Sequence, residues 1–150
     1  MNGIIKSIAV VLLTLATMAC EKISQTETKI PLEVNTNNIS GKWQLVEWNG
    51  ETLTEGTYVY LDIIRQDRTY TMYQNMDSFF NVSHVVTGSY VLYTEPTQGA
   101  IIRGTYDHDS GDWAHRYIVK ALYADEMLWV ATDDPTFTQT YIRVESIPVE

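Results

Sequence analysis

The sequence has only one cysteine, Cys20, in 150 residues. A disulfide within the chain is therefore excluded, and the fold must be stabilised by the burial of apolar groups. Positive charge is also scarce, because ten Lys and Arg residues stand against 19 Asp and Glu residues and give a formal net charge of −9. An acidic chain without a basic cluster repels phosphate groups. We therefore expect no nucleic-acid partner.

The sequence also lacks the motifs of common enzyme and metal sites. It contains no Gly-x-Ser-x-Gly elbow and no glycine-rich phosphate loop. The acidic loop 107–112 has glycine at its fifth position rather than its sixth, so it does not fit a calcium loop. The three histidines do not have the spacing of metal ligands: they are His84, His108 and His115. We therefore predict a protein that is not an enzyme and that has no cofactor or metal.

The first 20 residues have the order of a secretory signal. Lys6 is the only basic residue before an apolar run at residues 8–16, and the small residue Ala19 precedes Cys20. The apolar run is too short for a membrane-spanning helix, which needs about 20 residues. With a cysteine directly after the small residue, the signal resembles a bacterial lipoprotein signal peptide. An ordinary secreted protein and a signal anchor with a chance cysteine are the alternatives.

The resemblance to a lipoprotein implies that residues 1–19 are removed and that acyl chains are attached to Cys20. It also implies a place in the bacterial cell envelope, where the lipid would hold the protein to a membrane. We expect this to be the outer membrane, with the face of the membrane left open. Residues 20–38 are mostly polar and predict a tether, whereas residues 39–150 have the length of one domain with its own core.

From residue 39 onward the pattern is that of consecutive β-strands. Short segments rich in Val, Ile, Thr, Tyr and Trp alternate with turn residues. No long segment has an apolar period of 3.6 residues, so any helix should be a single turn. The eight predicted strands are residues 41–48, 57–65, 69–74, 84–93, 100–106, 115–123, 127–132 and 138–145. Sequential strands with tight turns predict an all-β fold, an eight-stranded up-and-down antiparallel barrel that leaves no exposed edge.

Alternation along two of these strands predicts which side chains face the barrel interior. The inward set is Ala100, Ile102, Gly104 and Tyr106 in one strand and Tyr117, Val119, Ala121 and Tyr123 in the other. The segment 57–65 is apolar on both faces, so we expect something to cover it from outside, with the tether as a candidate.

The ends of the predicted domain resemble those of lipocalins. Gly41-Lys42-Trp43 opens the first strand with the Gly-x-Trp sequence of that family, and Arg143 lies in the last strand. The resemblance implies that Trp43 closes one end of the barrel and that Arg143 lies across it in a cation–π contact. The domain also looks like small lipocalin-like domains of gut-bacterial lipoproteins, most of which have no assigned function. The short first turn at residues 49–51 predicts a more open mouth than in many lipocalins.

An eight-stranded barrel is just wide enough to be filled by side chains or to hold one small ligand. Candidate ligand-lining residues are Tyr90, Tyr106, Tyr117, Tyr123 and Trp129, with a plain core role as the alternative. The leading hypothesis is a lipid-anchored binding module for a small apolar or amphipathic molecule. The alternative is a filled barrel that binds an envelope protein through its outer face, with the aromatic residues Trp48, Tyr58 and Tyr60 as anchors.

Overall fold

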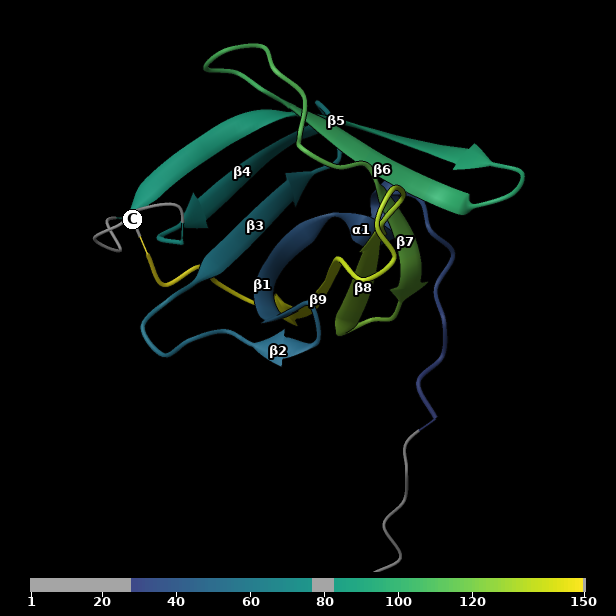
Figure 1. Ribbon diagram of the computed structural model, residues 1–150, viewed down its shortest axis with the longest axis horizontal. Helices are drawn as coiled ribbons and strands as arrows, with labels where there is room; N and C mark the ends of the chain where they lie inside the picture. The colour runs from purple at the N-terminus through teal and green to yellow at the C-terminus, as the bar shows by residue number, and fades with distance from the viewer. Residues whose placement is uncertain (1–27, 77–82, 150) are drawn as a thin grey trace, which may run out of the picture.

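The structure is a computed structural model that describes residues 28–76 and 83–149. The predicted signal sequence, Cys20 and the first part of the expected tether lie outside the described residues. The elements are α1 Thr36–Ile39, β1 Gly41–Trp48, β2 Glu51–Thr52, β3 Val59–Ile64, β4 Thr69–Gln74, β5 His84–Glu95, β6 Gly99–Tyr106, β7 Tyr117–Leu122, β8 Glu126–Ala131 and β9 Thr138–Val144 (Figure 1). The one helix among the described residues is a single turn, as predicted.

The strands form a closed antiparallel barrel. Each strand from β3 to β9 pairs with the next along the chain, β1 pairs with β3, and pairing of β1 with β9 closes the ring. The small strand β2 pairs only with β1 and stands outside the eight-stranded ring formed by the described residues. Figure 1 looks roughly along the axis of this ring. The predicted all-β, eight-stranded up-and-down barrel is confirmed.

The barrel closes because the strands alternate between apolar and polar side chains. In β1, Trp43 and Leu45 are buried, and in β8 the same holds for Met127, Trp129 and Ala131. Successive side chains of a strand point to opposite faces, so these sets all face the interior. Burying one large apolar side chain contributes about 1.5–3 kcal/mol, which lets the fold form without a disulfide.

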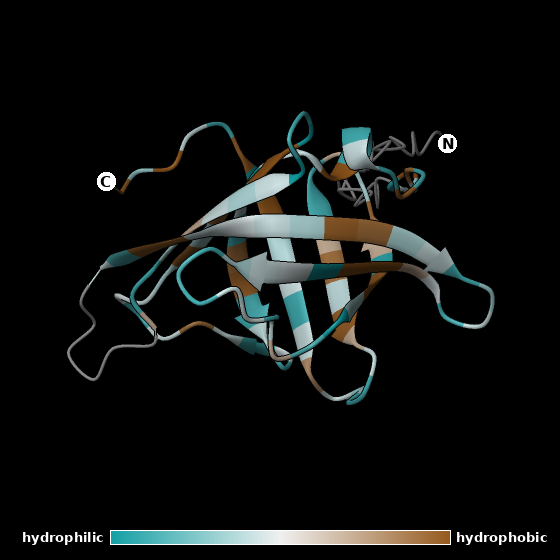
Figure 2. Ribbon diagram, turned by 90° about the horizontal axis from the view of Figure 1, so that it is seen from above, coloured by the Kyte–Doolittle hydropathy of each residue, from teal (hydrophilic) through white to brown (hydrophobic). Residues whose placement is uncertain are grey.

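Trp43 lies at one end of the barrel, in contact with α1 and with Arg143. Its ring is fully buried, and its Nε1 donates a hydrogen bond to the carbonyl oxygen of Ile39 in α1 at 2.8 Å. The guanidinium carbon of Arg143 lies 4.1 Å from the centre of the Trp43 ring, which is a cation–π contact. We call the part of the molecule around Trp43, Arg143 and α1 the closed end. Figure 2 shows α1 and the C-terminal segment at this same end of the barrel.

The Arg143 guanidinium also connects β9 to two other backbone segments at the closed end. It donates hydrogen bonds of 2.8 Å to the carbonyl oxygens of Asn38, Ser40 and Ala124. Partial burial lowers the pKa of Arg143 from its usual value. Gly41 has a φ of 122° and leaves space for this side chain, because a Cβ there would lie 2.5 Å from an Arg143 nitrogen. Only glycine meets both requirements without strain.

The described part of the expected tether packs against the barrel. The backbone N–H of Leu32 donates to the carbonyl of Leu122 at 2.8 Å, and the side chains of Leu32 and Val34 pack against the core. The Lys29 ammonium pairs with Asp125 at 3.1 Å and Glu126 at 2.9 Å. The tether was predicted from its mostly polar composition, which gave no weight to these two apolar side chains. They are two residues apart, so both can face the barrel.

The outer face of β3 is covered only in part, because Ile64 on that face is 40% exposed. Tyr60 points away from the interior residues of β3 and is still only 9% exposed. The tether was the expected cover. Its Leu32 hydrogen bond and its Lys29 ion pairs are instead made with residues 122–126, at the turn between β7 and β8.

A β-bulge in β7 corrects part of the predicted interior. The pairing with β8 shifts between Val119 and Ala121, so the extra residue reverses the alternation. Leu122 is buried as a result, whereas Tyr123 leaves the interior and its ring lies 5.8 Å from the Lys29 ammonium. The inward assignment of Ala121 and Tyr123 was therefore wrong.

In β6 the alternation does not separate the two faces as expected. Ile101 and Ile102 are both buried, while Ala100 and Tyr106 are only partly buried.

Candidate ligand cavity

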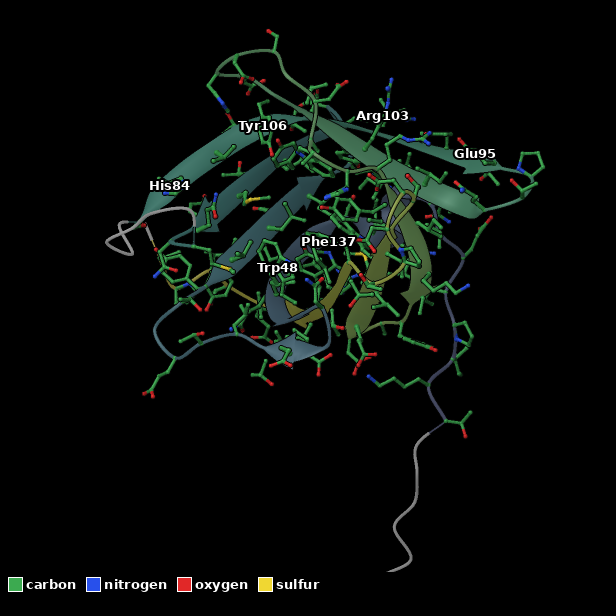
Figure 3. All side chains as sticks on the ribbon, viewed as in Figure 1. Trp48, His84, Glu95, Arg103, Tyr106 and Phe137 are labelled. Atoms are coloured by element: carbon green, nitrogen blue, oxygen red, sulfur yellow. The ribbon has the colours of Figure 1, made fainter. Side chains whose placement is uncertain are left out.

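The barrel is hollow at the end opposite Trp43. A cavity of about 660 Å³ opens between the strands there, and we call this part the open end. In Figure 3 the side chains of Trp48 and Phe137, which line the cavity, lie within the ring of strands, whereas Glu95 and Arg103 lie outside it. The interior is therefore filled at the closed end and open at the other.

One wall of the cavity is an array of aromatic rings centred on Trp129. The Tyr117 ring stacks on Trp129 with a centroid distance of 5.4 Å and an angle of 30°. The ring centroid of Trp113 lies 5.9 Å from that of Trp129, with an interplanar angle of 33°. The ring centroid of Tyr141 lies 4.9 Å from that of Trp129. Such offset pairs each contribute about 0.5–1.5 kcal/mol beyond the burial of their area, so the wall is preformed and rigid.

A second aromatic group borders the rim. The Phe137 ring lies 5.5 Å from Trp48 in an edge contact and 4.6 Å from the imidazole of His115. His115 in turn lies 6.0 Å from Tyr117, which joins the rim to the first wall. The cavity is thus bordered by rings contributed by β1, β7, β8 and the loops before β7 and β9.

The polar groups of the cavity are uncharged or lie at its rim. No Asp, Glu, Lys or Arg is among the described residues that line it. Burial raises the pKa of the Tyr117 and Tyr141 hydroxyls, so both are neutral at physiological pH. The Tyr141 hydroxyl donates to Oε1 of the buried Gln139 at 2.8 Å. The interior therefore offers hydrogen bonds without a net charge.

One buried donor of the wall has no acceptor. The Trp129 side chain is 2% exposed, and its Nε1 has no hydrogen-bond partner among the described residues. By contrast, Nε1 of Trp113 donates to the Tyr70 hydroxyl at 2.8 Å. A buried donor without a partner costs about 1–3 kcal/mol. Trp129 thus carries a buried N–H without a partner, behind the surface of the cavity rather than on it.

Trp113 covers the seam between β6 and β7. These two strands share only two residue pairs. The connecting loop folds back, so that the backbone N–H of Trp113 donates to the carbonyl oxygen of Gly104 at 2.8 Å. The ring occupies the space of a side chain at Gly104, because a Cβ there would lie 2.1 Å from it. The Tyr70 hydroxyl bridges the indole to the carbonyl of Thr105 at 3.0 Å, and burial raises the pKa of Tyr70 to about 12.

The three histidines all border the cavity, which their sequence spacing did not predict. Nδ1 of His115 lies 2.9 Å from an Asp133 oxygen, and Nε2 of His108 lies 3.3 Å from an Asp109 oxygen. No group of three or more His, Cys, Asp or Glu residues that could hold a metal ion occurs in residues 28–76 and 83–149.

The cavity includes three of the five predicted ligand-lining residues. Tyr106, Tyr117 and Trp129 line it. Tyr90 is instead buried in the core, where its hydroxyl donates to the Ile64 carbonyl at 3.4 Å, and Tyr123 lies outside the barrel interior because of the β7 bulge. Trp113 also lines the cavity and was not among the predicted residues. A large apolar ring in a polar turn was a sign that this side chain is buried against the barrel.

The aromatic anchors expected for an outer binding face do not form one exposed patch. Trp48 lines the cavity, Tyr60 is nearly buried, and the Tyr58 hydroxyl donates to the Ser83 hydroxyl at 2.6 Å.

Among the described residues no helix is long and apolar enough to cross a membrane. No protein-family model matches the sequence, and no curated protein sequence matches it either. The fold is similar to the crystal structure of a lipocalin-like protein from Bacteroides uniformis, with a TM-score of 0.50 and 15% sequence identity. The match covers 71% of this chain and 99% of that one. Together with the closed eight-stranded barrel, this similarity shows that the described part of the chain has a lipocalin-like fold.

Proposed function

We propose that this protein is a lipid-anchored binding protein of the bacterial cell envelope that holds one small apolar or amphipathic molecule in its barrel. The cavity of about 660 Å³ carries this proposal. Ligand pockets of proteins usually measure about 300–1,000 Å³ and are lined by apolar and aromatic side chains with a few polar groups. The open end has this composition, and a filled barrel acting through its outer face would have no use for it.

Binding would work by the removal of apolar ligand surface from water. Each square ångström buried contributes about 25 cal/mol, and the preformed aromatic wall limits the loss of side-chain entropy on binding. Gln139 and the cavity tyrosines would orient the polar part of an amphipathic ligand. The closed end takes no part, because Trp43 and Arg143 fill it.

The test is native mass spectrometry of the full-length protein, expressed in its own host and purified in a mild detergent. We expect a small-molecule adduct that dissociates on activation. Ala114→Trp should abolish or strongly reduce the adduct, because Ala114 is exposed at the cavity and a large ring there would obstruct it. Ala124→Trp, at an exposed position in the closed-end turn, is the matched control and should keep the adduct. An adduct that survives in A114W would contradict binding in the cavity.

The anchor is tested separately on the same preparation. The N-terminal peptide should begin at Cys20 and carry the mass of attached acyl chains, and Cys20→Ser should remain unlipidated and keep residues 1–19. A mature protein that begins elsewhere, or an intact N-terminus, would rule out the anchor and leave the cavity proposal in place.

A further inference from the structure

We infer that the cavity selects an amphipathic molecule whose polar head is a hydroxyl group, and that this hydroxyl donates a hydrogen bond to Nε2 of His115. The inference rests on the proposed function, because it names the polar group that the same cavity would recognise. Two features of the open end carry it: the bond that fixes the His115 imidazole to Asp133, and the position of that imidazole between the cavity and the outer surface.

The His115 side chain can be reached from the cavity. It lines the cavity, and 24% of its surface is exposed. It also lines a smaller depression of about 220 Å³ beside Arg103, whereas Asp133 lines that depression and not the cavity. The imidazole bonds to Asp133 through Nδ1, and its other nitrogen, Nε2, lies on the far side of the ring. Nε2 is therefore directed away from Asp133 and toward the cavity.

The bond to Asp133 decides which nitrogen of His115 can accept a hydrogen bond. Nδ1 lies 2.9 and 3.2 Å from the two carboxylate oxygens of Asp133. This bond lowers the pKa of Asp133, so the carboxylate is ionised at neutral pH and can only accept. Nδ1 then carries the hydrogen, and the lone pair of the neutral imidazole is on Nε2. Nε2 has no hydrogen-bond partner among residues 28–76 and 83–149, so it is free for a ligand.

Neighbouring contacts hold this imidazole in place. Its ring packs on Phe137 at a centroid distance of 4.6 Å and against Tyr117 at 6.0 Å. The backbone N–H of Thr132 donates to the carbonyl oxygen of Arg116 at 2.9 Å, which joins the two chain segments that carry the histidine and the aspartate. A carboxylate bonded to one nitrogen of a histidine fixes the orientation of the ring and makes the other nitrogen more basic. The acceptor is therefore preformed, which limits the entropy lost on binding.

Other polar heads fit this acceptor less well. A carbonyl or an ether has no hydrogen to donate to the lone pair. A carboxylate would lie near the ionised Asp133 in a protein of net charge −9, and an ammonium group would lose hydration without a carboxylate in the described lining. The other two histidines of the cavity are differently placed, because Nε2 of His108 lies beside Asp109 and His84 has interactions of its own. A neutral hydroxyl head is the best match.

The apolar body of the ligand would point inward. His115 lies at the rim, whereas the inner lining includes the buried side chains of Leu45 and Val59 and the aromatic wall. In Figure 3 the rim residues Trp48 and Phe137 lie within the ring of strands, so a ligand held beside them is already inside the barrel. The hydroxyl would stay near the mouth while the rest of the molecule is removed from water.

The experiment uses isothermal titration calorimetry on the full protein, freed of bound ligand by washing in detergent and placed in phosphatidylcholine nanodiscs. Empty nanodiscs are the blank for partitioning into lipid, and mildly alkaline buffer favours the neutral form of histidine side chains. The probes share one apolar body: 9-fluorenol donates and accepts, 9-fluorenone only accepts, and fluorene does neither. Fluorene-9-carboxylate and 9-(aminomethyl)fluorene add a negative and a positive charge.

We expect fluorenol to bind about tenfold more tightly than fluorenone or fluorene, because one net hydrogen bond of about 1.4 kcal/mol corresponds to a tenfold change in affinity. Both charged probes should bind more weakly than fluorenol, since neither charge finds a partner in the described lining.

Two variants assign the contact. His115→Phe keeps an aromatic ring beside Phe137 but removes the acceptor, so it should bring the affinities for fluorenol and fluorenone to about the same value. Asp133→Ala frees the imidazole and should lower the preference for fluorenol from about tenfold to about threefold, because Nε2 then carries the hydrogen in part of the molecules. Asp112→Ala is the matched control and should keep the preference, because Asp112 lines the same depression while His115 bonds to Asp133.

A preference for fluorenol that persists in H115F would overturn the role of His115. Equal preferences in D133A and D112A would overturn the role of Asp133 as the residue that positions the imidazole.

The five probes on the unmodified protein decide the head group even if a variant fails to fold. If fluorenone, fluorene or either charged probe binds as tightly as fluorenol, the inferred recognition of a hydroxyl is overturned while the cavity remains a binding site. If none of the five probes binds, both the inference and the proposed function are contradicted.

Discussion

The two ends of this barrel use tryptophan in opposite ways. At the closed end, Trp43 donates its N–H to Ile39, and Arg143 lies across its ring and links three backbone segments. At the open end, Trp129 is equally buried but its N–H has no partner among the described residues, and a cavity lies beside it. We infer that stability is concentrated at the closed end, which leaves the open end free to hold a ligand.

Arg143→Ala should give the largest loss of stability. The substitution removes the cation–π contact and leaves three closed-end carbonyls without their donor, which we expect to cost about 3 kcal/mol or more. Urea unfolding followed by tryptophan fluorescence measures this. Arg103→Ala, at an exposed position on β6, is the control and should change stability by less than about 0.5 kcal/mol. A loss below about 1 kcal/mol for R143A would remove the contrast between the ends.

The pair Trp43→Phe and Trp129→Phe compares the ends directly. Both substitutions replace a buried indole by a smaller ring, but only the first one removes a formed hydrogen bond. We expect a cost of about 2–3 kcal/mol for W43F and a clearly smaller one for W129F, because loss of the unpartnered donor offsets part of the lost packing. The same urea titration decides the matter, and equal costs would contradict our interpretation of Trp129.

Tyr70→Phe tests the support of the open end and should cost about 1–2 kcal/mol, because it leaves the Trp113 N–H and the Thr105 carbonyl without their shared partner. Burial raises the pKa of Tyr70 from 10.0 to about 12, so the neutral hydroxyl stabilises the fold below pH 10 and that contribution is lost as the pH rises toward 12. Stability should therefore fall less steeply over this range in Y70F than in the original protein. Identical alkaline profiles would exclude a contribution of Tyr70.

The smallest effect is expected for Lys29→Gln. The ion pairs of Lys29 with Asp125 and Glu126 are exposed, so they contribute little and are screened by salt. The variant should be slightly less stable at low ionic strength and indistinguishable from the original in molar salt. Lys120→Gln, on the exposed face of β7, is the control. A large, salt-independent loss for K29Q would contradict the weak, screened contribution that we expect from these ion pairs.

Much of the barrel could be predicted from the sequence because its determinants are local. Alternation of apolar and polar residues defined the strands, and Gly41, Trp43 and Arg143 are the family features by which the resemblance identified the closed end. The β7 bulge could not be predicted, since one extra residue between Val119 and Ala121 leaves no mark on composition and yet turns Tyr123 out of the interior.

The open end was harder to predict because part of its border comes from loops. His84 begins β5, whereas His108 and His115 lie in the connection between β6 and β7, and all three line the cavity. Trp113 lies in a polar turn, and its place depends on the missing side chain of Gly104 in a neighbouring strand. Such contacts depend on hydrogen bonds and packing between segments that are distant in sequence. The spacing of apolar residues along one strand cannot predict them.

The docking of the N-terminal segment has a consequence for orientation. Residues 29–34 meet the barrel beside the β7–β8 turn, at the opposite pole from the cavity. The chain between Cys20 and Lys29 can span at most about 30 Å. If Cys20 is acylated and the cavity binds a ligand, as we propose, the closed end would lie near the bilayer and the mouth of the cavity would face outward. The ligand would then be exchanged with the aqueous compartment or a docked carrier rather than drawn directly from the lipid.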